Sequence, residues 1–338
     1  MHFWDREKEV KDLKAHIQSE PNSILFVYGP KSSGKSTLLQ KVIDDLIEDD
    51  MFKETHQVYW FDLRGKLISN YRDVVDLFFI DEDSYKKLEE KSKKLEAGFM
   101  QFFKVELSTK ELMESKRLDP FVYMEEVLKG QEKIGVIVFD ELQRLKDVYI
   151  NGERKVVDAL FNFFVRLTKV LHLSHVIVMT SDTFFIEEVY TSSSLKNTSI
   201  YYLVDFFDDD TARKILTEEG LSKDDAEYVV NMAGGVPWVL VETVSNGNPK
   251  KKIENIYKEV RARLDDILAT AYENGKYQET FEMIKKVFEG TIDIVRDRKK
   301  FRWLVEKELL FYDPINRSVR FQTRLDEKAA EELLISGQ

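Results

Sequence analysis

Residues 29–36 read Gly-Pro-Lys-Ser-Ser-Gly-Lys-Ser and match the pattern G-x-x-x-x-G-K-[ST]. In this pattern the glycines let the backbone turn tightly, so that its N–H groups and the positive end of a following helix point at one place. Lys35 would neutralise the β- and γ-phosphates of a nucleotide, and the Ser36 hydroxyl would be a ligand for Mg²⁺. The spacing therefore predicts a phosphate-binding loop for ATP or ADP together with Mg²⁺.

The flanks of this loop favour a nucleotide site over the alternative, a serine-rich turn that merely caps a helix. Residues 24–28 are an apolar run suited to a buried parallel strand, and residues 37–47 place apolar side chains at helical spacing. Strand, glycine loop and helix start is the context that a phosphate site needs. The residues expected to contact the nucleotide here are Gly29, Pro30, Lys31, Ser32, Ser33, Gly34, Lys35, Ser36 and Thr37.

Two acidic residues, Asp140 and Glu141, follow a second apolar run at residues 135–139. Such a run predicts a buried strand whose carboxyl end emerges at the ligand edge of a parallel sheet. There Asp140 would hold Mg²⁺, directly or through water, and Glu141 would polarise the attacking water. An apolar run that ends in two acids is common, and its position downstream of the phosphate loop is what gives it weight.

A third apolar run, residues 176–179, ends in the hydroxyl side chains of Thr180 and Ser181. A polar strand end beside the acidic pair could contact the γ-phosphate or the attacking water. We therefore count Thr180 and Ser181 with Glu141 and Lys35 as candidate catalytic residues. The alternative is an ordinary helix cap made by Ser181 or Asp182.

The composition excludes several classes of protein. The 338 residues are 43% hydrophobic and 33% charged, no apolar run approaches the length of a membrane span, and the first residues lack a signal-peptide pattern. Cysteine is absent, which excludes disulfides, thiolate metal sites and a cysteine nucleophile. The net charge of −11 argues against a basic footprint for nucleic acid over the whole chain. A cytoplasmic protein without membrane contacts is expected.

The elements that must position these residues form an α/β domain over residues 1–206. Residues 65–118 are expected to be a helical insertion, and a long helix is expected over residues 153–173. Mixed charges in residues 84–95 indicate a solvated helix face, with a docking arm for a partner protein as the alternative. The five predicted strands are residues 24–28, 57–63, 135–139, 176–180 and 199–204.

The rest of the chain reads as a helical domain, residues 207–275, followed by a smaller domain, residues 276–338. The second of these shows a helix, a basic helix and a hairpin, which is the skeleton of a winged helix. In residues 290–324, nine Lys or Arg against five Asp or Glu give a local net charge of +4. Winged helices contact DNA or proteins, and the sequence leaves both open.

The chain resembles the archaeal ATPase family, within the STAND class of AAA+-related P-loop ATPases. The resemblance extends over residues 3–245. The segments that carry it are Phe3-Trp-Asp-Arg-Glu-Lys8, the phosphate loop, Phe139-Asp140-Glu141, Thr180-Ser181 and Gly235-Val-Pro237. The resemblance implies a parallel P-loop sheet of five strands, a helical lid and a C-terminal winged helix. It also implies that Asp5, Arg6 and Pro237 close over the base and ribose of the nucleotide.

Members of this class look like switches, in which the ATP and ADP states set the positions of the lid and winged helix for a protein or nucleic-acid partner. This sequence departs from many AAA+ relatives, because residues 191–199 contain Lys196 but no arginine that could reach a neighbour's γ-phosphate. A monomer or weak oligomer with slow turnover is therefore expected. Arg144, Arg154 and Arg166 lie elsewhere in the core, and nothing in the sequence selects one of them.

Two other functions share the phosphate loop. A small-molecule or nucleoside kinase would need it, but would not explain the segment 235–237 or the C-terminal domain. An ATP-binding scaffold or chaperone-like module would hold ATP with negligible turnover, and Glu141 argues against that. The leading hypothesis is a switch that hydrolyses ATP to ADP and phosphate.

Overall fold

The computed structural model describes residues 4, 6–91, 99–100, 102–150, 152–192, 195–245 and 247–336. The chain forms two compact units, which we describe separately. The sheet unit comprises Arg6–Tyr28 and Lys35–Leu203. The lid unit comprises Trp4, Gly29–Gly34 and the chain from Val204 onward. The order of elements confirms the predicted fold class, an α/β P-loop domain followed by a helical lid and a winged helix.

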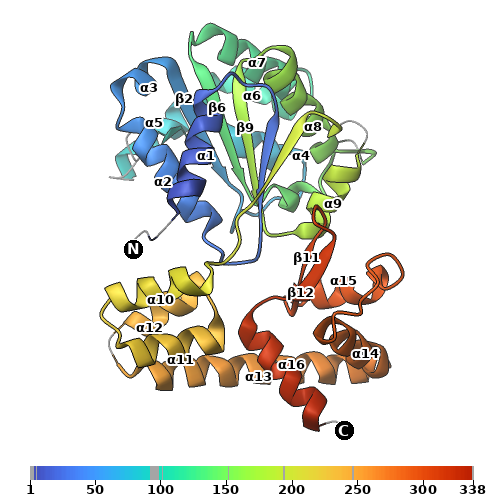
Figure 1. The fold of residues 1–338 in the computed structure, drawn as a ribbon. Coiled ribbons are helices and arrows are strands. Elements are labelled where there is room, and N and C mark those ends of the chain that lie inside the picture. Colours follow the sequence, from blue (N-terminus) through green and yellow to red (C-terminus); the bar gives the residue numbers. More distant parts are fainter. Residues whose placement is uncertain are drawn as a thin grey trace. The chain divides into compact units, whose positions relative to one another are not determined.

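A parallel sheet is the framework of the sheet unit (Figure 1). Within the described residues it has six strands in the order β10–β1–β9–β6–β2–β4. The strands are β1 (Ile24–Tyr28), β2 (His56–Asp62), β4 (Phe99–Met100), β6 (Ile134–Asp140), β9 (Ser174–Thr180) and β10 (Ser199–Leu203). The expectation of five strands was wrong, because the short β4 pairs with β2 and covers backbone groups that would otherwise form an open edge.

Helices lie on both sides of this sheet (Figure 1), and every residue of β1 and β9 is buried. This is why the central strands are continuous apolar runs in the sequence. Asp119 caps one of the helices by accepting from the backbone N–H of Phe121, with Pro120 in the first turn, as predicted. The helices are α1 (Glu7–Gln18), α2 (Lys35–Ile47), α3 (Asp50–Thr55), α4 (Tyr71–Phe78), α5 (Glu82–Lys91), α6 (Leu107–Glu114), α7 (Pro120–Gly130), α8 (Val156–Val165) and α9 (Thr183–Thr191).

The expectation that the segment after β2 is mainly helical was incomplete. It also contains a short parallel pair, β3 (Phe79–Asp81) and β5 (Phe103–Val105). The Phe103 ring stacks on Tyr59 of β2 with 4.4 Å between ring centroids, so tertiary packing favours the extended backbone. The lysine-rich stretch lies partly in α5, and its residues 92–95 are outside the described residues.

The long helix expected over residues 153–173 is interrupted at both ends. It begins later, because β8 (Arg154–Lys155) pairs with β7 (Tyr149–Ile150). After α8 the chain continues as one π-helical segment, Arg166–Val170, in which the Thr168 hydroxyl bonds back to the carbonyl oxygen of Phe164 at 2.9 Å. Helical periodicity does not distinguish a π segment from an α-helix over so few residues.

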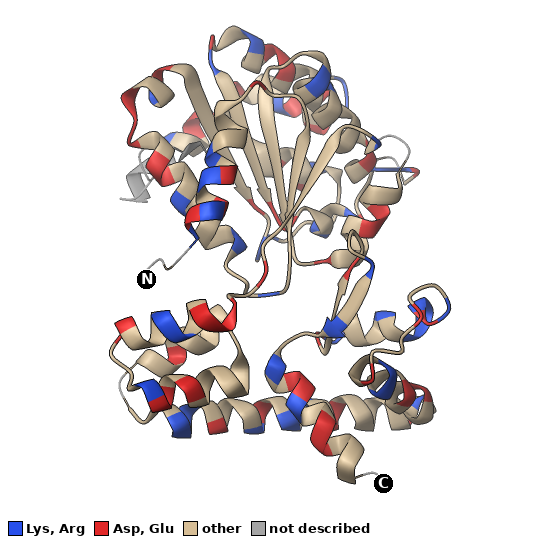
Figure 2. Cartoon of the chain, viewed as in Figure 1, with Lys and Arg blue, Asp and Glu red and all other residues tan. Residues whose placement is uncertain are grey.

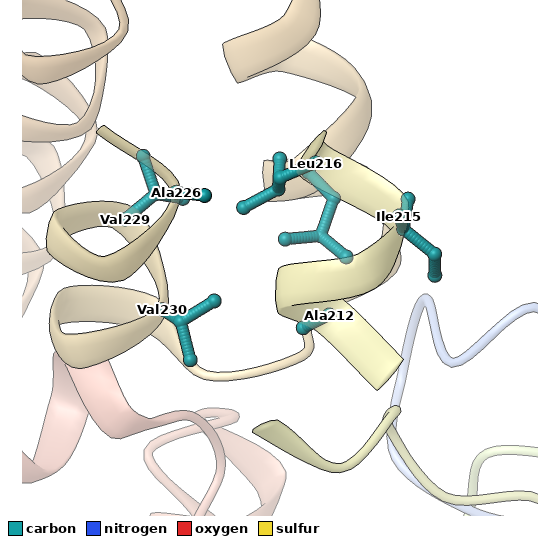
Figure 3. Packing of buried hydrophobic residues seen from close by; sticks show 7 residues of the cluster. Ala212, Ile215, Leu216, Ala226, Val229 and Val230 are labelled. Carbon is teal, nitrogen blue, oxygen red and sulfur yellow. The ribbon is translucent and has the colours of Figure 1, made fainter. Parts of the chain in front are cut away.

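The helical part of the lid unit has its own apolar core (Figure 3). Trp4 packs against this core, and its indole N–H donates to Glu219 at 2.8 Å. The helices are α10 (Asp209–Glu218), α11 (Lys223–Ala233), α12 (Pro237–Val244) and α13 (Pro249–Glu273). The core residues are Ala212, Ile215, Leu216, Ala226, Val229, Val230 and Leu240. Trp4 thus belongs to the same packed cluster as these helices.

The C-terminal part of the lid unit has the order helix, helix, hairpin, helix. The hairpin is antiparallel, as predicted. The last helix was not anticipated; its first turn is fixed by Thr323 and Asp326, which bond to each other's backbone N–H at 3.2 and 3.0 Å. The elements are α14 (Tyr277–Phe288), α15 (Arg298–Glu306), β11 (Leu310–Asp313), β12 (Ser318–Phe321) and α16 (Arg324–Ser336).

The described part of the chain contains no helix with the length and apolar character that a membrane crossing requires.

Candidate nucleotide site

The register of the sheet brings the predicted site residues to one edge. Tyr28 of β1 pairs with Thr180 of β9, and Asp140 of β6 pairs with Met179 of β9. On the other side of β6, Asp62 of β2 pairs with Asp140. Because the strands are parallel, their carboxyl ends meet here, which is where open α/β sheets bind ligands.

The loop after β1 has the backbone that its glycines predict. Gly29 has φ +152°, and a Cβ there would lie 2.2 Å from the carbonyl oxygen of Val204. Gly34 has φ +90°, in the region that favours glycine. Between them Ser33 is buried, whereas Lys31 and Ser32 are exposed. The loop therefore cannot take a side chain at Gly29, and it delivers the chain into the first turn of α2.

Lys35 is the first residue of α2, and only 7% of it is exposed. Burial lowers the pKa of its ammonium group to about 8, and the carboxylates of Glu141 and Asp140 act in the opposite direction. A phosphate group beside Lys35 would supply a counter-charge at the positive end of the helix. Thr37 is the third residue of α2, and it is exposed.

Ser36 and Asp140 are in contact: the Ser36 hydroxyl donates to Asp140 Oδ2 at 2.8 Å. Asp140 is 2% exposed, and burial raises the pKa of its carboxyl against the effects of the Ser36 hydrogen bond and of Arg64. Hydroxyl and carboxylate oxygens are hard donors that suit Mg²⁺, which binds proteins through one or two carboxylates plus substrate phosphates. The described residues contain no cluster of three or more His, Cys, Asp or Glu that could hold a metal alone. The pair therefore fits an ion shared with a nucleotide.

Glu141 is linked to Thr180 through a residue that the sequence interpretation missed. Gln143 donates to Glu141 Oε2 at 2.5 Å and accepts from the Thr180 hydroxyl at 2.8 Å. Glu141 has φ +65°, and its N–H donates to the carbonyl oxygen of Met179 at 2.9 Å. The orientation of the Glu141 carboxylate is thus fixed by its backbone and by Gln143. The sequence signal for Gln143 was its place two residues after Glu141.

The predicted helix cap after β9 is made by Asp182, which accepts from the N–H of Phe185 at 3.0 Å. Thr180 is fully buried and also accepts from the N–H of Asp182 at 3.0 Å. Ser181 lies between them and is half-buried. The geometry thus connects Thr180, but not Ser181, to Glu141 by a described hydrogen-bond path.

Arg64 is the second residue that was missed. Its guanidinium donates to Ser36 Oγ at 3.1 Å and forms an ion pair with Asp140. In the sequence Arg64 only follows the predicted second strand; it is the structure that places the end of this strand beside Asp140. Among the arginines considered from sequence, Arg166 binds Glu125 through two contacts of 2.5 and 2.8 Å. Arg144 donates to the carbonyl oxygen of Lys66 at 3.4 Å.

The residues expected at the base and ribose divide between the two units. Arg6, in the sheet unit, is 6% exposed, pairs with Glu9 at 2.9 Å and lies near enough to Lys35 for its charge to lower the lysine pKa. Pro237, in the lid unit, starts α12. Gly235 before it admits no side chain, since a Cβ would lie 2.0 Å from the carbonyl oxygen of Phe207. Asp5 lies outside the described residues.

Comparison with known proteins finds relatives over most of the chain. The model of an ATPase domain found predominantly in Archaea matches residues 3–243. An uncharacterized ATP-binding protein of Methanocaldococcus jannaschii is 37% identical over 341 residues, covering 95% of this chain and 91% of the relative. An uncharacterized ATP-binding protein of Pyrococcus abyssi is 36% identical over 346 residues, covering 98% of each.

The solved structure of the Aeropyrum pernix ORC2 protein in ADPNP–ADP complexes matches with a TM-score of 0.51 at 10% identity. It covers 99% of this chain and 95% of that one, so the likeness of fold extends over the lid and winged helix. Together, the matched model and the relatives show that the chain belongs to the family of ATPase domains found predominantly in Archaea.

Proposed function

We propose that the protein binds ATP with Mg²⁺, hydrolyses it slowly, and uses the ATP and ADP states to set the lid and winged helix for a partner. The observation that carries this proposal is the contact of Ser36 with Asp140 beside Lys35 and Glu141. This arrangement combines a cation for the phosphates, oxygen donors for a metal and a carboxylate for water. The names of the relatives in Methanocaldococcus jannaschii and Pyrococcus abyssi, both ATP-binding proteins, support the choice of ATP.

In the proposed reaction the oxygen of a water molecule forms a bond to the γ-phosphorus, and the bond from that phosphorus to the bridging oxygen of ADP breaks. Glu141 accepts the proton that the water loses, and Lys35 neutralises phosphate oxygens. When bound, Mg²⁺ supplies further positive charge at these oxygens, and Ser36 and Asp140 would hold it. Gln143 orients Glu141.

The orientation of Glu141 favours hydrolysis over static ATP binding. A binder needs Lys35 and the loop, but gains nothing from a carboxylate that is fixed by Gln143 and Thr180. Glu141→Gln should keep ATP affinity and lose about a hundredfold or more in phosphate release, the usual contribution of a general base. Lys35→Ala should lose most of the ATP affinity. Glu126→Gln, a substitution at an exposed acid paired with Lys129, serves as the matched control.

Wild-type turnover in Glu141→Gln would contradict the hydrolysis proposal, and unchanged ATP affinity in Lys35→Ala would contradict the nucleotide site itself. Phosphate release by the wild-type chain at the level of Lys35→Ala would leave the static ATP-binding scaffold as the function. Chromatography of the labelled γ-phosphate with candidate acceptors tests the kinase alternative, because a kinase transfers the phosphate to the acceptor instead of releasing it.

The proposed partner is a protein, with duplex DNA as the alternative. Several basic residues of the C-terminal part are already paired with acids: Arg302 with Glu306 at 2.9 Å, and Arg324 with Asp209 at 2.9 Å. Blue and red segments also alternate along α13 (Figure 2), which is typical of a mixed surface and not of a basic footprint. Arg298, Lys299 and Arg302 are the α15 residues that would face DNA.

Gel shifts at rising salt test the DNA alternative. A few phosphate contacts would make the affinity fall steeply with salt, because each contact releases counterions. A complex at micromolar protein that disappears between 50 and 200 mM salt, and is lost in Arg298→Ala with Lys299→Ala, would favour DNA. Absence of a complex at low salt would leave the protein partner.

A further inference from the structure

Arg64 occupies the oxygens that the proposed function assigns to Mg²⁺. Its guanidinium contacts Ser36 Oγ at 3.1 Å and pairs with Asp140 through Oδ2, the same oxygen that accepts from Ser36. Asp140 Oδ2 already accepts from both Ser36 and Arg64, so a metal ion that binds this oxygen has to take the place of one of these donors. The positive charges of the guanidinium and of Mg²⁺ would also repel each other at such short range. Binding of Mg²⁺ with a nucleotide must therefore move Arg64 away.

The position of Arg64 is set by a tight turn. The N–H of Lys66 donates to the carbonyl oxygen of Leu63 at 3.3 Å, and Gly65 has φ +67°. Asp62 accepts from the N–H of Arg64 at 2.8 Å and from its Nε at 3.3 Å. The backbone at Arg64 is thus anchored at the sheet edge, and the end of the side chain is the part that can move.

The Arg64–Asp140 pair is a poor candidate for a purely structural contact. The Arg64 side chain is 53% exposed and that of Asp140 is 3% exposed. A half-exposed arginine gains little stability from such a pair, because water and salt screen it. Removing the arginine, by contrast, takes away a cation that is in direct contact with this buried carboxylate.

Once displaced, Arg64 remains within reach of the phosphates. Ser36 follows Lys35 directly in α2, and the phosphates are expected at the start of that helix. The Arg64 charge also acts on Lys35 and lowers the lysine pKa, so the two cations lie in one electrostatic neighbourhood. Arg64 belongs to the same unit as Lys35, Asp140 and Glu141. No second chain is required to bring it there.

We propose that Arg64 is the arginine of the hydrolysis reaction, supplied by the same chain: without nucleotide it rests on Asp140 and Ser36, and with Mg²⁺ and ATP it moves to the γ-phosphate and stabilises its transition state. This inference rests on the proposed function. It replaces the missing arginine before the last strand, and it explains how a monomer can hydrolyse ATP. The planar fork of the guanidinium suits both positions, because its geometry matches carboxylate and phosphate oxygens alike.

The first measurement is phosphate release at saturating ATP by the full chain. Turnover should fall about a hundredfold or more in Arg64→Ala, because an arginine at the γ-phosphate stabilises the negative charge of the transition state. Arg64→Lys should recover only part of it, because an ammonium group lacks the fork. Arg72→Ala is the matched control: Arg72 is 69% exposed and pairs with Glu114 at 2.5 Å, and turnover should stay at the wild-type level. Specific activity of the wild-type chain should not rise with protein concentration.

The second measurement does not depend on turnover. Binding of a fluorescent ADP is followed as Mg²⁺ is titrated, since ADP lacks the γ-phosphate and isolates the competition at Asp140. The Mg²⁺ concentration for half-maximal enhancement should be several-fold lower in Arg64→Ala than in the wild type and in Arg72→Ala. Thermal unfolding confirms that each variant is folded.

Wild-type turnover in Arg64→Ala, or faster turnover, would overturn the catalytic assignment. An unchanged Mg²⁺ requirement would overturn the resting position on Asp140. Failure of the proposed function looks different, because the wild-type chain itself would then release no more phosphate than Lys35→Ala. That result appears before any Arg64 variant is measured.

Discussion

Two buried carboxylates, Asp140 in the sheet unit and Asp326 in the lid unit, each pair with an arginine. Asp140 is 2% exposed and pairs with Arg64; Asp326 is fully buried and pairs with Arg263 at 2.5 Å. Burial raises the pKa of both carboxyls, and the arginines oppose that shift. Each pair thus consists of a buried aspartate and a partly exposed arginine. They differ in which groups supply the remaining hydrogen bonds.

Asp326 is held by its own helix. It accepts from the Thr323 hydroxyl at 2.6 Å and from the Thr323 N–H at 3.0 Å, and so fixes the first turn of α16. Asp140 accepts instead from Ser36 and Arg64, both at the predicted phosphate site. A carboxylate that caps a helix stabilises it only while its hydrogen-bond donors stay in place. A carboxylate at a ligand site, by contrast, must be able to exchange its donors for the ligand. The source of the hydrogen-bond donors, and not burial, therefore separates a structural acid from a candidate functional one.

The largest expected effect is on turnover in Asp140→Asn. Loss of the carboxylate charge should weaken metal binding and lower phosphate release about a hundredfold or more, because a bound metal contributes several kcal/mol to the transition state. The free energy of unfolding should change little, since Asn keeps the volume and the bond from Ser36. Steady-state phosphate release and chemical denaturation measure the two quantities. A large loss of stability with unchanged turnover would show that Asp140 is a structural acid, like Asp326.

Asp326→Asn should show the opposite pattern. It weakens the first turn of α16 and leaves Arg263 without its carboxylate, so unfolding should become easier by about 1–3 kcal/mol. The half-exposed Arg263 can regain water, which keeps the cost below that of a fully buried charge. Turnover per folded molecule should stay at the wild-type value. Urea denaturation gives the stability. A strong loss of turnover at a temperature where the variant is folded would show that Asp326 also affects the reaction.

His175 is a buried base, in contrast to these two acids, and it should make the stability of the protein depend on pH. Burial, with a smaller contribution from the neighbouring His16, lowers the pKa of His175 from 6.5 to about 3. The unfolded chain therefore takes up this proton first as the pH falls below about 6.5, and stability decreases. From pH 7 to pH 5 the expected loss is about 2 kcal/mol. Lowering of the His16 pKa by burial acts in the same direction.

Denaturation curves of the wild-type chain and of His175→Gln at pH 7 and pH 5 measure this effect. The variant should lose most of the pH dependence whatever its absolute stability. An equal pH dependence in both proteins would mean that other groups carry it.

The smallest effect is expected for Gln143→Ala. Gln143 acts through Glu141 and is a positioning residue, so its loss should lower turnover by about tenfold, less than the hundredfold or more that a general base itself contributes. ATP affinity should stay unchanged, because the described hydrogen bonds of the Gln143 side chain go to Glu141 and Thr180 and not to Lys35 or Ser36. Gln143→Glu would place a second negative charge beside Glu141 and should be slower still. Equal turnover in both variants and the wild type would show that the backbone alone orients Glu141.

The phosphate loop, the acidic strand end and the fold class were predicted from the sequence because each depends on local pattern. Gly29 and Gly34 follow from the tight turn, and the buried strands follow from runs of apolar residues that both faces of the sheet must bury. The hairpin of the winged helix likewise lies within a short stretch. Neighbouring residues supply the physical constraint in all these cases, so the order of residue types is sufficient. The domain boundaries at 206 and 275 and the switch role stay predictions.

Only the tertiary structure selected Arg64, Gln143 and the pairing of β4 with β2. Arg64 is 28 residues from Ser36 and 76 from Asp140 along the chain, so no local pattern connects them. Their contact exists because β2 and β6 are parallel neighbours and Asp62 pairs with Asp140. The sequence already contained an arginine able to serve this site, and the register of two strands decided which of its arginines it was.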